Sequence, residues 1–119
     1  MSETLDAALA LLGASVEVVV DRPLGGVHPC HGFGYPVNYG ALPSVRAADG
    51  EGLDAYVVGL DVPVDRASGV VVGVIERLDD DDPKLVVSHG GAPLGDAEIE
   101  RAVAFQERRF AHRLHRLTT

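Results

Sequence analysis

Two acidic clusters contain the residues of this sequence that are best suited to chemistry. Asp49–Asp54 places three carboxylates within six residues, together with two glycines that allow a tight turn, and Asp79–Asp82 places four in a row. Carboxylates at this density repel one another, and hard cations such as Mg²⁺ prefer oxygen ligands. The clusters therefore predict a divalent-cation site. Each cluster taken alone is also typical of a solvated loop, and that alternative stays open.

The segments around the clusters are predicted to be strands, with the carboxylates on the turns between them. Runs rich in β-branched residues indicate the strands, and glycines inside the third run indicate curvature or a bulge. The expected strands are Ser15–Asp21, Leu53–Leu60, Ser68–Arg77 and Lys84–Ser88, with a short extended piece over Tyr35–Leu42. Loops that meet at one mouth of a small curled barrel would let the two clusters share a cation.

Helices are predicted at both ends of the chain. A short helix is expected over Ser2–Leu12, and a longer one begins at Asp96, a good N-cap. The longer helix has an apolar stripe that extends from Ile99 to Leu117, and basic residues load its last turns, where they suit the helix dipole. The chain is therefore expected to be α+β and mainly β. We expect a small five-stranded OB-like barrel with these two helices, forming one domain over residues 1–119.

Composition excludes several classes of protein. The chain has 119 residues, 46% of them hydrophobic, which suits one compact domain. A net charge of −8 disfavours nucleic acid as a partner. The apolar stretch Ala7–Leu12 is too short for a signal core or a membrane span. Cys30 is the only cysteine, so no intrachain disulfide can form, and we expect a reducing compartment, the cytoplasm, and no membrane partner.

A specific motif precedes the first cluster. The block Tyr35–Gly40 reads Y-P-V-N-Y-G, and the D-G-x-x-L-D pattern of Asp49–Asp54 begins ten residues after Tyr39. A third block, Asp82–Val86, reads D-P-K-L-V. This combination and its spacing resemble the soluble inorganic pyrophosphatases of family I, which are built on a small β-barrel. The resemblance covers about Val16–Val87.

The resemblance implies a role for each polar residue of these blocks. Glu51 stands where the family has an aspartate and would act as general base beside the attacking water. Tyr39 and Lys84 would contact the phosphates by a hydrogen bond and by charge. Asp21 falls, more loosely, where the family carries a glutamate. The implied metal ligands are Asp49, Asp54, Asp80 (or its neighbour Asp79) and Asp82.

The chain also departs from the family pattern. It lacks the hairpin that in the family follows the first strand and supplies a lysine, a glutamate and an arginine to the site. The family's Tyr-Lys pair on the C-terminal helix is absent near Arg109. The candidates that replace these phosphate ligands are His28, His31 and one of Arg108 or Arg109. Two alternatives for the histidines remain: hydrogen bonding within their loop, or a soft-metal site with Cys30.

The resemblance thus implies a short variant that hydrolyses diphosphate to two phosphates by a metal-activated water. Mg²⁺ is the expected cofactor, with Mn²⁺ or Zn²⁺ as substitutes, and the family suggests a homo-oligomer. Two other functions stay open because cationic ligands are missing. One is hydrolysis of another phosphorylated small molecule, and the other is a non-catalytic module that binds metal or phosphate on the same barrel.

Overall fold

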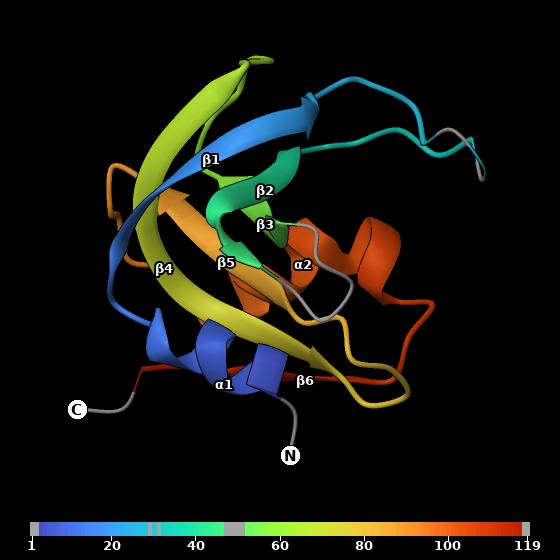
Figure 1. Cartoon of the computed structure of the whole chain (residues 1–119). Coiled ribbons are helices and arrows are strands. Elements are labelled where there is room, and N and C mark those ends of the chain that lie inside the picture. Colours follow the sequence, from blue (N-terminus) through green and yellow to red (C-terminus); the bar gives the residue numbers. More distant parts are fainter. Residues whose placement is uncertain (1–2, 29, 31, 47–51, 118–119) are drawn as a thin grey trace.

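A strongly curved sheet dominates the structure, a computed structural model that describes residues 3–28, 30, 32–46 and 52–117. Six strands and two helices make up these parts of the chain (Figure 1). In chain order they are α1 (Glu3–Ala10), β1 (Ser15–Arg22), β2 (Asn38–Arg46), β3 (Gly52–Val58), β4 (Arg66–Arg77), β5 (Lys84–His89), α2 (Asp96–Glu107) and β6 (His112–His115). Among the described residues, no helix has the length and apolar character that a membrane span requires.

The sheet closes into a barrel. Its strand order is β1-β2-β3-β5-β4-β6, and a further pairing between β1 and β4 joins the first five strands into a ring. β3 and β5 run parallel, whereas the other paired strands are antiparallel. Closure satisfies the backbone groups that an open sheet edge would expose. The expected five-stranded, mainly β barrel with two helices is confirmed, with one further strand added to it.

Glycines allow the strands of the ring to approach closely. A Cβ atom on Gly69 would lie 2.3 Å from the carbonyl oxygen of Ser88, so no other residue fits there without a backbone shift. The pairing of β4 with β5 shifts register between Val71 and Gly73, as the glycines of this strand predict. The bulge lets the twelve residues of β4 bend around the barrel and pair with three other strands.

Alternating side chains divide the core into two clusters. On β3, Leu53, Ala55 and Val57 point into the barrel, where α1 covers one end (Figure 1). Tyr56 points to the opposite face and packs with Ile99 and other residues of α2. Successive residues of a strand face opposite sides, so Asp54 shares the α2 face with Tyr56. By the same rule Lys84 of β5 and Arg77 of β4 lie on that face as well.

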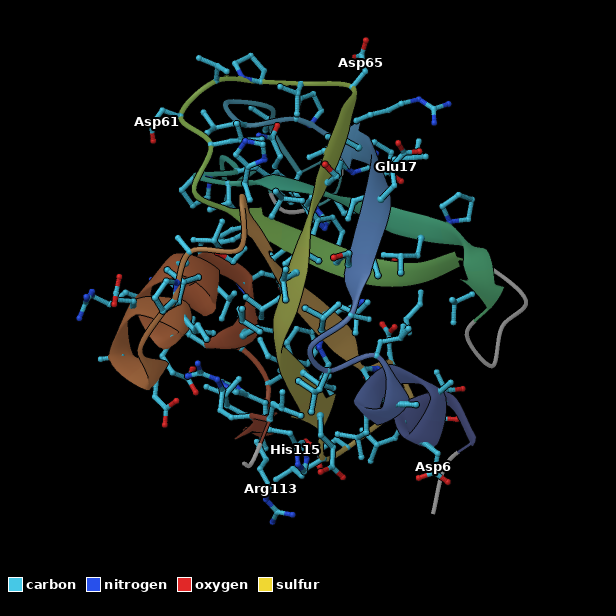
Figure 2. All side chains as sticks on the ribbon, turned by 90° about the vertical axis from the view of Figure 1, so that its left-hand side faces the viewer. Asp6, Glu17, Asp61, Asp65, Arg113 and His115 are labelled. Atoms are coloured by element: carbon cyan, nitrogen blue, oxygen red, sulfur yellow. The ribbon has the colours of Figure 1, made fainter. Side chains whose placement is uncertain are left out.

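The predicted extent of the C-terminal helix was wrong. The helix α2 ends at Glu107, and residues 112–115 form β6, which pairs with the second half of β4. Without β6, that half of β4 would have an unpaired edge. Strand pairing at this edge outweighs the helical spacing of the apolar residues. Glu76 on β4 then lies 2.8 Å from His115 and 3.8 Å from Arg113, so these two side chains of β6 serve strand pairing; both are labelled in Figure 2. The short helix also ends earlier than predicted, at Ala10.

Candidate active site

A cavity of about 340 Å³ opens on the α2 face of the barrel. Its lining includes the end of β1, the first residues of β2 and β3, the end of β4, the start of β5 and the end of α2. Four cations line it against two carboxylates, Asp21 and Asp54, although the whole chain has a net charge of −8. The cations are Arg22, Arg77, Lys84 and Arg109. Positive charge is therefore concentrated here, which suits an anionic ligand.

Lys84 joins the two acidic segments. Its Nζ atom donates to Asp54 Oδ2 at 2.5 Å and to Asp82 Oδ2 at 2.8 Å. Only 4% of the Lys84 side chain is exposed. Burial alone would lower the pKa of Lys84, but the charge of Asp54 and the hydrogen bonds of Asp54 and Asp82 raise it above its ordinary value. The ammonium therefore stays charged and holds the two carboxylates toward one point.

Tyr39 lies beside this group and keeps its hydroxyl proton. Burial raises the pKa of Tyr39 well above its ordinary value, and the charge of Lys84 only partly opposes the shift. The Nζ atom of Lys84 lies 5.9 Å from the centre of the Tyr39 ring. Asn38, the residue before it, accepts hydrogen bonds from the backbone of Leu24 and of Val64. The motif thus fixes two loops and presents a hydroxyl donor to the cavity.

A buried ion pair supports the floor of the cavity. Glu107, which is completely buried, accepts from Arg77 Nε at 3.1 Å and from Arg77 Nη2 at 2.8 Å. The hydroxyl of Tyr56 donates to the same carboxylate, and Gln106 donates to that hydroxyl at 2.7 Å. Burial and the charge of Glu107 raise the pKa of Tyr56, so its hydroxyl remains a donor. Sequence reasoning did not identify this network.

Arg22 and Arg77 were also not predicted as cavity residues. Strand alternation offers a signal for Arg77, because Ile75, two residues earlier, is fully buried against α2. Arg22 is the last residue of β1, and no local sequence pattern indicates that its side chain lines the cavity. Arg109, by contrast, was a predicted replacement for a missing phosphate ligand, and it does line the cavity.

Aromatic rings form the other wall of the cavity. His28 and Phe33 lie 4.6 Å apart between ring centres, and Phe33 packs edge-on against Phe105 of α2. The guanidinium of Arg109 covers Phe33 at 4.7 Å. An isolated antiparallel bridge joins Val27 and Gly34 near these rings. His28 thus reaches the cavity as predicted, and its Nδ1 accepts from the backbone of Cys30.

The predicted metal ligands are only partly described. Asp49, Glu51 and His31 lie outside the described residues. Asp54 and Asp82 converge on Lys84 Nζ, and two carboxylate oxygens aimed at one cation suit the hard metal ions that the sequence predicts. Asp80 lies elsewhere: it lines a second, smaller hollow with Asp81 and Glu76. Within residues 3–28, 30, 32–46 and 52–117, no three metal-binding side chains are close enough to form a site.

The sequence profile of inorganic pyrophosphatase matches residues 15–107. The chain belongs to the inorganic pyrophosphatase family. Members of this family are hydrolases. The matched span contains all three blocks that carried the resemblance, which are Tyr35–Gly40, Asp49–Asp54 and Asp82–Val86. No curated protein matches the sequence closely.

Solved structures of bacterial inorganic pyrophosphatases share the fold. The Helicobacter pylori protein is 19% identical with a TM-score of 0.59, and the alignment covers 86% of this chain and 82% of that one. The Coxiella burnetii protein is 20% identical with a TM-score of 0.58, over 86% and 84%. The Ehrlichia chaffeensis protein is 21% identical with a TM-score of 0.53, and the alignment covers 63% of this chain and 60% of that protein. The pyrophosphatase barrel is thus confirmed.

Proposed function

We propose that this pyrophosphatase-family chain hydrolyses inorganic diphosphate to two phosphates with the help of divalent metal ions. The observation that carries the proposal is the group formed by Asp54, Lys84 and Asp82: Asp54 and Lys84 line a cavity with Tyr39 and further cations, and Asp82 pairs with Lys84. Carboxylates can hold metal ions there, and the cations can bind the phosphates. Both kinds of group are needed to bring a highly charged anion close to acidic side chains.

The metal side of the proposed site consists of Asp54 and Asp82, together with the predicted ligands Asp49 and Asp80. Mg²⁺, or Mn²⁺ or Zn²⁺ in its place, would supply a coordinated water of lowered pKa and neutralise phosphate oxygens. Glu51 is the proposed general base for the attacking water. Since Asp80 lines a different hollow in the structure, Asp82 and Asp54 are the stronger candidates for the shared ligands.

The phosphate side of the proposed site is built from cations of separate elements. Lys84 and Tyr39 present an ammonium and a hydroxyl, as the family motif implies. Arg22 at the end of β1 and Arg109 after α2 line the same cavity. These two guanidinium groups are our candidates for the positive charge that the missing hairpin and the missing Tyr-Lys pair would otherwise supply. Guanidinium groups bind phosphate through paired hydrogen bonds.

The test is phosphate release from diphosphate with Mg²⁺, Mn²⁺ and Zn²⁺ in parallel. Wild-type protein should release phosphate in a metal-dependent manner, and Asp54→Ala should remove most of that activity. Release at the same low level from both proteins would contradict the proposal. If diphosphate nevertheless binds tightly by calorimetry, the chain is a binding module without turnover.

A second candidate substrate is favoured by the aromatic wall. Diphosphate has no apolar surface to bury, whereas His28, Phe33 and Tyr35 line the cavity together with the cations. A cavity of this volume is within the range of small organic ligands. Nucleoside diphosphates and triphosphates should therefore be assayed beside diphosphate. A Phe33→Ala variant that loses activity on nucleotides alone would establish this reading, and a wide preference for diphosphate would reject it.

We also infer a cytoplasmic homo-oligomer, because the family resemblance and the single cysteine favour it. Sedimentation of the purified chain tests the assembly. A monomer at micromolar concentration would contradict that part of the proposal.

A further inference from the structure

Arg77 lines the cavity, and one edge and one face of its guanidinium are already occupied. It is the last residue of β4, and its side chain is 8% exposed. The Nε and Nη2 edge donates to Glu107, and the ring of Phe110 covers one face at 3.7 Å. Nη1 points the other way, toward Asp82, whose Oδ2 lies 3.8 Å away. That distance exceeds a hydrogen bond, so an anion can take the donor.

The supporting groups fix the guanidinium in orientation as well as in place. A bidentate carboxylate holds its plane, and the hydroxyl of Tyr56 holds the carboxylate in turn. A buried ion pair of this kind adds little to stability by itself, because desolvation offsets the attraction. A pair of apolar residues would fill the same space at lower cost. The pair therefore suggests a role that needs a rigid positive charge at the cavity floor.

We propose that Arg77 binds an oxygen of the substrate phosphate through Nη1, and that Glu107 is its positioning residue. This inference rests on the proposed function, and it adds a phosphate ligand that the motif does not contain. A guanidinium fixed before binding loses little conformational entropy when the anion arrives. Binding by phosphate would also release Asp82 from the attraction of Arg77, which leaves that carboxylate to a metal ion.

The experiment measures binding and turnover separately. Calorimetry with methylene-bisphosphonate and Mg²⁺ gives the affinity for a diphosphate that is not cleaved, and phosphate release gives kcat and KM. Arg77→Lys keeps the positive charge but loses the planar, two-pronged donor geometry of the guanidinium. In R77M/E107L both charges are removed, so the fold is not left with an unpaired buried carboxylate. Arg66→Met is the matched control, because Arg66 pairs with the exposed Glu17 at 3.0 Å on the surface.

Both Arg77 variants should bind the analogue about 10- to 100-fold more weakly, the range expected for one charge-assisted hydrogen bond. Arg66→Met should bind as wild type. Glu107→Gln should raise KM as well as lower the melting temperature, whereas a purely structural Glu107 would change only the latter.

Three outcomes separate this inference from the proposed function. If folded R77M/E107L binds the analogue as tightly as wild type, the inference is wrong even where hydrolysis is present. If the analogue binds in an Arg77-dependent way without hydrolysis, the inference stands and the proposed turnover fails. If wild type neither binds nor hydrolyses, both are wrong.

Discussion

The two faces of the barrel strands contrast sharply. Toward the interior, β3 and β5 present Leu53, Ala55, Val57, Leu85 and Val87, all fully buried and apolar. Toward α2, the same strands present charged and hydroxyl-bearing side chains beside apolar ones. One face holds the barrel together through nonspecific burial, and the other combines packing with a polar site. Because side chains alternate, neighbouring residues offer paired tests of this division.

The largest expected effect concerns the interior face. Leu53→Ala removes a fully buried side chain from the barrel core. The free energy of unfolding should fall by about 2–5 kcal/mol, since the surrounding strands cannot collapse into the space. Urea unfolding measures the change. The kcat/KM of the remaining folded protein should stay within about threefold of wild type, and a larger loss would show that the interior also controls the site.

The adjacent residue should behave in the opposite way. Asp54→Asn keeps the shape of the side chain but removes a charge that the proposed metal ions need. We expect kcat to fall about 10²–10³-fold, as for other groups that stabilise charge at reacting centres. The free energy of unfolding should change little, because Asp82 still pairs with Lys84. The phosphate-release assay decides this, and an active Asp54→Asn protein would place the metal elsewhere.

Two tyrosines that face each other across β2 and β3 sharpen the comparison within the site face. Tyr39 and Tyr56 are register partners, with ring centres 4.9 Å apart. Tyr56→Phe removes a donor to the buried Glu107 and should cost about 1.5–3 kcal/mol of stability. Tyr39→Phe should instead raise KM and leave stability nearly unchanged. Matching effects of the two substitutions on stability would contradict the separate roles.

Lys84→Met tests whether the Lys84 ammonium competes with metal ions for the carboxylates of Asp54 and Asp82. In the structure the ammonium occupies the oxygens of Asp54 and Asp82 that would bind metal. Removing it should tighten Mg²⁺ binding in the absence of diphosphate by about tenfold, a common size of coupling between sites. The same variant should weaken binding of the diphosphate analogue. Calorimetry with Mg²⁺ alone decides the matter, and unchanged or weaker Mg²⁺ affinity would reject the competition.

Local patterns were enough to predict much of the barrel and the motif-bearing side of the site. β-Branched runs located β1, β3, β4 and β5, and the glycines of β4 marked its bulge. Tyr39, Asp54 and Lys84 belong to blocks of fixed spacing, and the structure places all three at the cavity. Their neighbours Asp49 and Glu51 remain predictions, because they lie outside the described residues.

The errors and omissions arise from contacts between distant parts of the chain. Phe110, Leu114 and Leu117 have the spacing of a helix face, but the structure of residues 112–115 is decided by the open edge of β4, which the local sequence does not reveal. Arg77 appears in the sequence as an ordinary charged strand end. Strand alternation places it on the face toward α2, but its pairing with Glu107, thirty residues later, leaves no local signal. Charge pairing over such separations has no periodic signature.

The smallest expected effect tests the corrected C-terminal segment. His112 at the start of β6 contacts Glu100 of α2 at 2.9 Å through Nε2, and its Nδ1 lies 2.9 Å from the carbonyl oxygen of Phe110. Burial lowers the pKa of His112, but these two contacts, together with the charges of Glu100 and Glu107, raise it above its ordinary value. Both ring nitrogens face acceptors, so the folded protein favours the doubly protonated ring.

A raised folded-state pKa sets the sign of the pH dependence. The stabilising contribution of His112 should be fully present below the pKa of the unfolded chain, about 6.5, and should be lost as pH rises through the folded-state value. The loss should be below about 1 kcal/mol, because Glu100 is partly exposed. Urea unfolding of wild type and His112→Gln at several pH values between about 5.5 and 8.5 measures the difference. If the two proteins lose stability in parallel over this range, the contact between α2 and β6 is not the titrating element. If only wild type shows the decline, the charge pair of His112 and Glu100 joins β6 to α2. The strand that the local sequence failed to predict is then tied to the helix over the polar face of the barrel.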